Sequence, residues 1–573
     1  MTQPGKQSVT SAFTRQLVLM LVIFLLVSGP TFAQNGSAYF TPGNIVVSRS
    51  VYVDTGSITA GTTVLPPDCS VANCPVPATA VTDSTYPFVF NNDTVDSSFG
   101  VTSKIFLDQM TTAGTLVTSL EVPNSSQNGV PPTKDQMVTS FSSKSEMALN
   151  LSTDGNSLSF MGYLAPIGAI DVSNANTAGA VDPTNPVGES ISRVVAQVDQ
   201  HGKFRYTLTN AYSGNNGRAA ILNSAANLLY TAGNAGNGAT LIVDGVKTQP
   251  TGIIIGTGTQ IMSPEVKAEV AQSPGTPSIV GSFNISQLGD TADKIGKDTN
   301  FRGLAIHDDV LYYTKGSGSN GVNTVYFLDS TGTECTNENG IGLPQPGAAL
   351  PTTGISFDAT VVQTEGVKPF NMCILKGFPT ILANTKKAVI NFPFGIWFAS
   401  PTVLYVADEG SGAVGSTVAN FYSPATTANN PTAGLQKWIF GTPVAGKWNL
   451  AYTLTSGLDL GMPYAVPNSP SGDVYPVGNN SGPGGSGFPW APATDGLRNI
   501  TGVVNGDGTT VTIYAITSTI SGSGDQGADP NKLVMITDTL SDTSLPAESF
   551  STVRTAGFGE VLRGVSFTPG TSQ

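Results

Sequence analysis

Hydrophobic residues recur along this chain in short runs that are separated by polar turns, and the pattern repeats. It is clearest in residues 146–163, 218–233, 302–317, 394–410 and 498–518. Each of these stretches begins with an alternating or apolar run, crosses a short polar turn and resumes with a second run that usually contains Tyr. Turns such as Asp154-Gly155 suit tight hairpins. The pattern therefore predicts a series of β-hairpins.

Further predicted strands follow each hairpin and complete a four-stranded unit. Residues 193–212 form two runs joined across "DQHGK", and residues 532–540 and 550–557 take the equivalent place later in the chain. No amphipathic helical pattern of any length interrupts these units. Four-stranded antiparallel sheets that repeat without a covering helical layer are typical of a β-propeller, an all-β fold. A β-sandwich, the competing fold, would not explain the recurrent hairpin.

The run "RGVSF" at residues 563–567 has the character of an opening strand, and no further strands of its unit follow it. Residues 43–53, 104–110 and 115–123 supply the three missing strands, so we expect this unit to pair the two ends of the chain and close the ring. Six blades result when the opening strands are placed at residues 147–151, 219–222, 303–307, 395–399, 500–504 and 564–567. The least regular stretch, residues 239–290, leaves room for a seventh.

Several of these segments together resemble a known group of proteins. They include "NIVVSRSV", "LSTDGNSLSFMGY", "VLYYTKGSGSNGVNTV" and "LRGVSFTP", which occur in this order along the chain. The pattern is similar to that of secreted bacterial β-propeller proteins of a functionally uncharacterised family. The resemblance implies the propeller fold and export from the cell, and it supplies no catalytic residues.

The first 33 residues have the layout of a secretory signal peptide. Lys6 and Arg15 precede an unbroken apolar run of eleven residues at 17–27, and the small residues Thr31 and Ala33 suit signal peptidase. The run is too short to span a bilayer comfortably. We therefore expect a secreted protein, extracellular or periplasmic. Its mature domain, residues 34–573, should be a single propeller without a membrane contact.

The chain contains four cysteines, an even number that fits an exported protein. Cys69 and Cys74 lie in "CSVANC", a spacing that differs from the CxxC of redox and zinc sites, and Cys335 and Cys373 are the natural second pair. Three pairings are open in principle, and two structural disulfides are expected. The two histidines stand apart from the cysteines in the sequence, so no metal site of this kind is predicted.

The formal net charge of −13 becomes −15 when Lys6 and Arg15 are removed with the signal peptide. Long-range electrostatics therefore disfavour nucleic acid and anionic membranes as partners. Only 11% of the residues are charged. We expect a monomer with a weakly charged surface.

A set of charged residues stands at corresponding positions, immediately before the opening strand of most blades. It consists of Glu146, Arg218, Arg302, Arg498 and Arg563, with Phe394 in the sixth place. Since the opening strand lines the central channel, these side chains are expected to ring its mouth. Four guanidinium groups in such a ring would grip a carboxylate, a phosphate or a sulfated sugar by bidentate hydrogen bonds. The alternative is that each arginine braces the neighbouring blade.

The connections between strands are unequal, and the long ones are predicted to lie on one face of the propeller. They include residues 54–103, 164–192, 408–434 and 455–497. Insertions of this kind are the usual carriers of binding sites. Trp490, in the last of these connections, is placed to stack on a sugar.

Enzyme signatures are missing from the sequence: it contains no HExxH, GxSxG or P-loop motif. His307, beside Asp308 and Asp309, is a candidate general base, but its short turn assigns it to the face opposite the long connections. The segment "DEGSG" at 408–412 offers oxygen ligands, so calcium is the one cofactor left open.

The preferred hypothesis is a secreted binding or scaffold module that recognises an extracellular glycan, polymer or protein through its loop-bearing face. The alternative is a calcium-dependent extracellular hydrolase or lyase, similar to propeller lactonases or phytases, with its site at the channel mouth.

Overall fold

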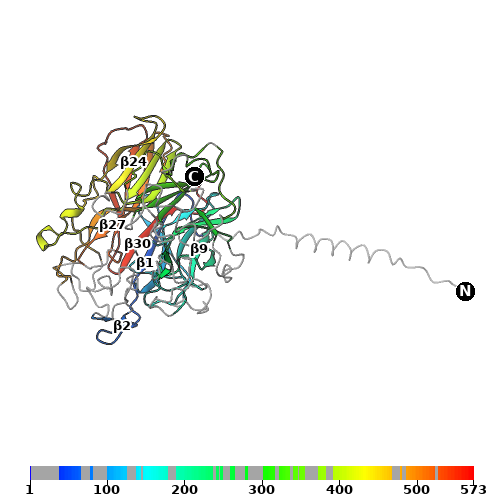
Figure 1. The fold of residues 1–573 in the computed structure, drawn as a ribbon. Coiled ribbons are helices and arrows are strands. Elements are labelled where there is room, and N and C mark those ends of the chain that lie inside the picture. The colour runs from blue at the N-terminus through cyan, green and yellow to red at the C-terminus, as the bar shows by residue number, and fades with distance from the viewer. Residues whose placement is uncertain are drawn as a thin grey trace. The chain divides into compact units, whose positions relative to one another are not determined.

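Six antiparallel sheets are arranged in a ring and form a six-bladed β-propeller, as the sequence predicts (Figure 1). In the computed structural model, Phe40–Gln573 form one compact unit and Met1–Tyr39 a second. The structure describes residues 1, 38–65, 78–81, 100–124, 137–143, 146–178, 189–235, 241–243, 246–248, 258–264, 278–281, 301–316, 322–335, 340–345, 347–354, 372–381, 391–467, 478–480, 486–522 and 527–572. No helix in these ranges is both long and apolar enough to cross a lipid bilayer.

Five blades use strands that follow one another along the chain. Blade 1 contains β7 (Asn150–Leu151), β8 (Ser157–Tyr163), β9 (Arg193–Asp199) and β10 (Phe204–Thr209). Blade 2 contains β11 (Gly217–Asn223), β12 (Leu228–Gly233), β15 (Gly258–Met262) and β16 (Ser278–Gly281). Blade 3 contains β17 (Phe301–His307), β18 (Val310–Lys315), β19 (Thr324–Leu328), β21 (Met372–Leu375) and β20 (Ile341–Gly342).

The next two blades have the same antiparallel order. Blade 4 contains β22 (Pro393–Ser400), β23 (Val403–Asp408), β24 (Gly434–Phe440) and β25 (Trp448–Leu454). Blade 5 contains β26 (Ala493–Val504), β27 (Thr510–Ile520), β28 (Lys532–Thr539) and β29 (Ser551–Thr555). The small elements outside the blades are β2 (Val64–Leu65) with β3 (Ala78–Thr79), β13 (Leu241–Val243) with β14 (Val246–Thr248), and the 3-10 helices η2 (Val418–Asn420) and η3 (Ser423–Ala425).

Blade 6 joins the last strand of the chain to three strands from near its beginning. It contains β30 (Glu560–Phe567), β1 (Ile45–Val51), β4 (Thr102–Met110) and β5 (Leu116–Glu121), and β6 (Thr139–Ser140) pairs with β4. Ile45 faces Phe567 and Val51 faces Glu560 in an antiparallel pairing. Figure 1 shows β30 and β1 side by side. The predicted closure of the ring is therefore confirmed.

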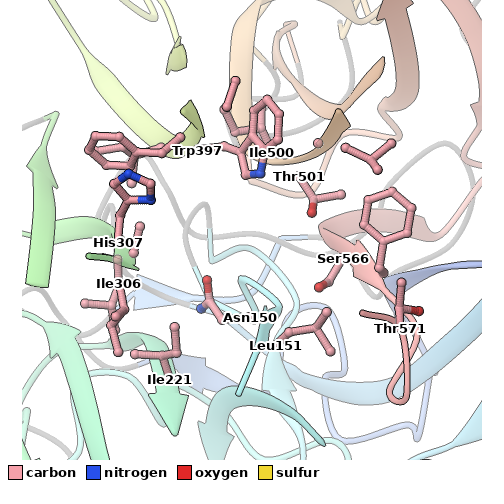
Figure 2. Close-up of a pocket in the computed structure, with 18 of the residues that line it drawn as sticks. Asn150, Leu151, Ile221, Ile306, His307, Trp397, Ile500, Thr501, Ser566 and Thr571 are labelled. Atoms are coloured by element: carbon pink, nitrogen blue, oxygen red, sulfur yellow. The ribbon is translucent and has the colours of Figure 1, made fainter. Parts of the chain in front are cut away.

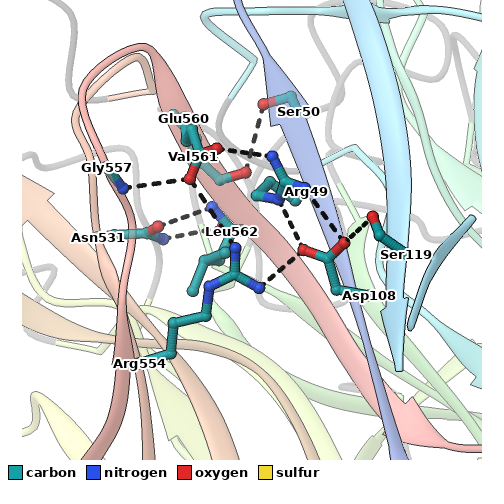
Figure 3. A network of polar contacts seen from close by, with 10 residues as sticks. All are labelled: Arg49, Ser50, Asp108, Ser119, Asn531, Arg554, Gly557, Glu560, Val561 and Leu562. Atoms are coloured by element: carbon teal, nitrogen blue, oxygen red, sulfur yellow. Dashed lines mark hydrogen bonds and ion pairs between the residues drawn. The ribbon is translucent and has the colours of Figure 1, made fainter. Parts of the chain in front are cut away.

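Polar contacts reinforce this closure (Figure 3). Asp108 on β4 is fully buried, and its Oδ2 lies 2.6 Å from Nε of Arg49 on β1 and 2.7 Å from Nη1 of Arg554 on β29. Arg49 also contacts Glu560 on β30 at 2.7 Å, and Ser119 donates a hydrogen bond to Asp108. Burial alone would raise the pKa of Asp108, but the Arg49 hydrogen bond and charge outweigh it and hold this pKa below its usual value. Because Arg554 belongs to blade 5, the network ties two blades together.

The pattern of buried residues follows from the way blades pack against one another. All but the last residue of β9 are buried, because a middle strand of a blade has a neighbouring blade on both of its faces. The outermost strand β25 instead alternates between buried and more exposed positions. At the centre, the innermost strands contact one another in the cyclic order β7, β11, β17, β22, β26 and β30.

Residues 239–290 do not form a seventh blade in their described part, since β15 and β16 complete blade 2. The Cys335–Cys373 disulfide is confirmed, with a Cα–Cα distance of 5.4 Å, in blade 3. Cys69 and Cys74 lie outside the described residues, as does the proposed signal segment except for Met1.

Candidate functional site

A cavity of about 460 Å³ lies on the axis of the propeller, at the C-terminal ends of the innermost strands (Figure 2). Its walls come from β7, β11, β17, β22, β26 and β30, so every blade contributes. Thr571 and Ser572, which follow β30, complete the lining. We call this cavity the axial pocket.

One wall of the axial pocket is aromatic. Trp397 on β22 is half-buried and lines the cavity beside Phe398. A Cβ atom on Gly502 of the adjacent β26 would lie 2.7 Å from the indole ring, so the missing side chain at this position lets the tryptophan lie against the strand. The imidazole of His307 stacks on Phe398 with 4.3 Å between ring centroids and 2° between planes.

The position of His307 follows from the turn that comes after it. Asp308 and Asp309 both have positive φ, 48° and 58°, and form a two-residue hairpin turn in which His307 pairs with Val310. This tight turn ends β17 at the rim of the axial pocket. His307 therefore lies at the end of the propeller that the sequence assigned to it, opposite the long connections, and its ring packs into the pocket wall.

The remaining wall combines aliphatic side chains with neutral polar groups. Asn150, Thr501 and Ser566 direct polar atoms toward the cavity, and Leu151 lies between Asn150 and Ser566 (Figure 2). Ile221 lines the cavity on the other side of Asn150. The amide of Asn150 is held in place because its Nδ2 donates to the Ala220 carbonyl at 3.0 Å.

The described lining of the axial pocket contains no Asp, Glu, Lys or Arg. Its one titratable side chain is His307. Burial lowers the pKa of His307, and Asp308 opposes this effect only in part. The described lining is therefore uncharged at neutral pH.

Neighbouring innermost strands are closely packed at the level between the axial pocket and the charged residues that the sequence singles out. A Cβ atom on Gly303 would lie 2.0 Å from the Phe394 carbonyl oxygen, and one on Gly395 would lie 2.4 Å from that of Arg498. At this level the innermost strands approach one another too closely for side chains. Each of these glycines directly follows a residue of the predicted ring.

The predicted ring residues occupy equivalent positions near the N-terminal ends of the innermost strands. All five are buried, with exposed fractions between 1% and 7%: Glu146, Arg218, Arg302, Arg498 and Arg563. Phe394, in the sixth place, is buried as well. Electrostatic interactions connect Glu146 with Arg563 and Arg218, and they connect Arg302 with Arg218 and Arg498. They do not line the axial pocket.

The five charged groups differ in their partners. Arg563 donates to Ser50 Oγ and to the Phe141 carbonyl, and Arg498 Nε lies 3.3 Å from Glu409 Oε2. Glu146 accepts hydrogen bonds from Thr139 Oγ1 and Tyr163 OH. Burial raises the pKa of Glu146. Arg563 and Arg498 thus have contacts of the kind expected from blade bracing.

Three carboxyl groups gather at the same end of blades 4 and 5: Asp408, Glu409 and Asp495. Asp495 accepts hydrogen bonds from Gly412 N at 2.7 Å and from Asn430 Nδ2 at 3.1 Å. Burial raises the pKa of Asp495 to about 7, and the charges of Glu409 and Asp408 add to this effect. Burial likewise raises the pKa of Asp408 to about 6. Both acids take up protons as the pH falls from 8 to 5.

These two acids predict a protein that is more stable at pH 5 than at pH 8. In that range the folded protein binds protons that the unfolded chain, with ordinary Asp pKa values, has already released. Acidification from pH 8 to pH 5 should therefore raise the free energy of unfolding, on the order of 4 kcal/mol. Urea unfolding at pH 8, 6.5 and 5 measures the slope of the free energy of unfolding against pH. Asp495→Asn should flatten it, and an unchanged slope in this variant would contradict the assignment.

The segment 408–412, considered above as a source of calcium ligands, uses its carboxylates within the protein. Asp408 accepts hydrogen bonds from Gly410 N and Phe392 N, and Glu409 contacts Arg498. Elsewhere in the described chain, Asp329, Cys335 and Cys373 place potential metal-ligand atoms within 4.8 Å of one another. Both sulfur atoms belong to the disulfide, so they are not thiolate ligands.

The sequence analysis did not identify the axial pocket, because its lining comes from the innermost strands of all six blades. Trp438 and Trp448 are buried, whereas Trp397 lines the cavity. Trp490, expected to be free for stacking on a sugar, is buried and 6% exposed. The sequence does hold one indication of the pocket, which appears when the innermost strands of the blades are aligned. Trp397 stands where the other blades have aliphatic residues or small polar ones, such as Ile221 and Thr501.

Comparison with known proteins finds only distant structural similarity to solved structures. No protein-family model and no curated protein matches the chain. A protein from Lactobacillus plantarum is similar with a TM-score of 0.31 and 10% identity, over 92% of this chain and 99% of that one. A polysaccharide lyase, PL25 ulvan lyase bound to -[GlcA(1-4)Rha3S]-, is similar with a TM-score of 0.29 and 10% identity, over 82% and 91%. Likenesses of this strength identify neither the ligand nor the activity of this chain. The fold and the site define a six-bladed β-propeller with an uncharged, partly aromatic pocket on its axis.

Proposed function

We propose that this protein is a carbohydrate-binding β-propeller that holds the end of a neutral glycan in the axial pocket. The observation that carries the proposal is the combination of Trp397 with neutral hydrogen-bonding side chains in a cavity whose described lining is uncharged. Sugars present C–H groups on one face and hydroxyl groups around the rim. An aromatic ring contacts the first, and amide and hydroxyl groups pair with the second.

The size of the cavity also favours a small terminal unit over a long segment. A volume of about 460 Å³ is within the range of small-ligand pockets. Neighbouring innermost strands pack closely near Gly303 and Gly395, toward the inner end of the pocket. We infer that the pocket admits a chain end, whereas an internal segment of a polymer needs a groove. The proposal therefore keeps the glycan ligand expected from the sequence and moves the site away from the long connections.

Binding to an array of neutral and acidic oligosaccharides, two to six sugars long, tests the proposal. Purified protein should bind neutral members, and the affinity of the best one, measured by calorimetry, should not depend on salt because the pocket carries no charge. Binding to none of the array, or to acidic members alone, would contradict it.

Trp397→Ala provides the residue-level prediction. Loss of the stacking surface should weaken binding of the best oligosaccharide by about tenfold or more. Trp438→Ala is the matched control, since this tryptophan is buried outside the pocket and stacks on Phe378, which does not line the pocket. It should lower the melting temperature and leave the affinity unchanged. Equal affinities for Trp397→Ala and wild type would place the ligand elsewhere.

A further inference from the structure

Arg218 is a buried cation that has no acidic partner among the described residues. It is the second residue of β11 and is 5% exposed. Its Nη1 donates to the Phe301 carbonyl at 3.3 Å, and its Nε has no hydrogen-bond partner. Within the described chain, no carboxylate forms an ion pair with it. A buried guanidinium in this state loses its hydration without a compensating charge, which is costly.

The charged residues around Arg218 do not neutralise its buried positive charge. Among its charged neighbours Arg302 acts most strongly, and it is also a cation. Glu409 is shared by two other arginines: its Oε1 lies 3.9 Å from Arg302 Nη2 and its Oε2 lies 3.3 Å from Arg498 Nε. Glu146, on the other side, is engaged by Thr139, Ser140 and Tyr163.

We propose that a small carboxylate anion binds on the propeller axis between Arg218 and Arg302. A guanidinium presents its N–H groups as a planar fork that matches the two oxygens of a carboxylate. Such an anion would give Arg218 the acceptors that the protein does not provide. Arg218 and Arg302 are 5% and 7% exposed, so both guanidinium groups are held away from bulk water. The close strand packing at Gly303 and Gly395 makes this site distinct from the axial pocket.

Thermal unfolding of the full chain in sodium formate tests the site, with formate as the probe. The sodium salt of MOPS, whose sulfonate is too bulky for an axial position, serves as the reference at equal ionic strength. The melting temperature should rise saturably with formate and not with MOPS, because an anion that binds only the folded state stabilises it. Broadening of the ¹³C-formate NMR signal in the wild type gives an independent reading.

Arg218→Met separates anion binding from a bracing role. In the MOPS salt this variant should match or exceed the stability of the wild type, since an unpaired buried charge has been replaced by an apolar side chain. In saturating formate the order should reverse, and the formate affinity should fall by about ten- to a hundredfold. Arg205→Met, an exposed arginine on β10, is the matched control and should respond to formate as the wild type does.

Three results would overturn the proposal, and the first two concern the response to formate. One is the absence of a formate-specific, saturable change in both the melting temperature and the NMR signal of the wild type. The other is an Arg218→Met variant that retains the full formate response, which would assign the anion to another site. An Arg218→Met variant less stable than wild type in MOPS would show that the Phe301 contact braces the blade, and would likewise contradict an unpaired cation.

Discussion

Asp538→Asn is expected to lower the free energy of unfolding by about 4 kcal/mol. Asp538 on β28 is fully buried, and its Oδ2 lies 3.0 Å from Nζ of Lys437 on β24, which is equally buried. Tyr452 donates to Asp538 Oδ1 at 2.8 Å, and Tyr405 also donates to this carboxylate. The substitution removes the negative charge and leaves the Lys437 ammonium buried between blades 4 and 5 without a counterion. Guanidinium unfolding measures the loss.

Asp309→Asn is the control for this experiment, because it removes the same charge at an exposed turn where Asn tolerates the positive φ of 58°. It should change the stability by less than about 0.5 kcal/mol. The double variant Asp538→Leu/Lys437→Met removes both buried charges together. It should therefore be more stable than Asp538→Asn and recover part of the stability that this single variant loses. A stability of Asp538→Asn within 1 kcal/mol of the wild type would show that the contact between these blades is energetically neutral.

Asp108→Asn is expected to cost about 3 kcal/mol at pH 7. It leaves Arg49 and Arg554 without their shared carboxylate at the closure of the ring, and the partial exposure of both arginines, 12% and 20%, keeps the cost below that of a fully buried pair. Because the pKa of Asp108 is lowered in the folded protein, the wild type should lose this advantage as the pH falls from about 4 through the folded pKa. Urea unfolding of both proteins between pH 7 and pH 3 tests this.

Glu121→Gln in the same blade is the matched control for Asp108→Asn. Glu121 forms a partly exposed ion pair with Lys104 at 3.2 Å, so its loss should cost less than about 1 kcal/mol. A pH-independent difference between Asp108→Asn and the wild type would exclude titration of Asp108 as the source of the effect.

The blade architecture could be predicted because each unit repeats the same hairpin and the terminal run 563–567 lacks partners after it. The strands of blade 2 after β12 were harder to recognise. Residues 239–290 place the pair β13 and β14 between β12 and β15, so the regular spacing of strands is lost. A periodic pattern identifies strands well, but it does not show which of them share a sheet when insertions intervene.

The candidate site was less accessible to sequence reasoning. The ring of arginines was visible because the same position recurs in several blades, and the structure does bring Arg218, Arg302 and Arg498 together. Their partners come from other segments, as Glu409 does, and no local pattern reveals which arginine remains unpaired. The axial pocket depends on how six strands converge, so the exposure of Trp397 could not be read from its own strand.

The pairing of β1 with β30 has a consequence for biosynthesis. Arg49 and Glu560, which contact each other in this blade, are separated by 511 positions. During translation, the strand at residues 45–51 therefore emerges long before its neighbour exists, with one hydrogen-bonding edge unsatisfied. Such an edge invites association with other nascent chains. We expect that ribosome-arrested chains ending before residue 560 aggregate or recruit chaperones, and that this tendency disappears once residues 560–567 have left the exit tunnel.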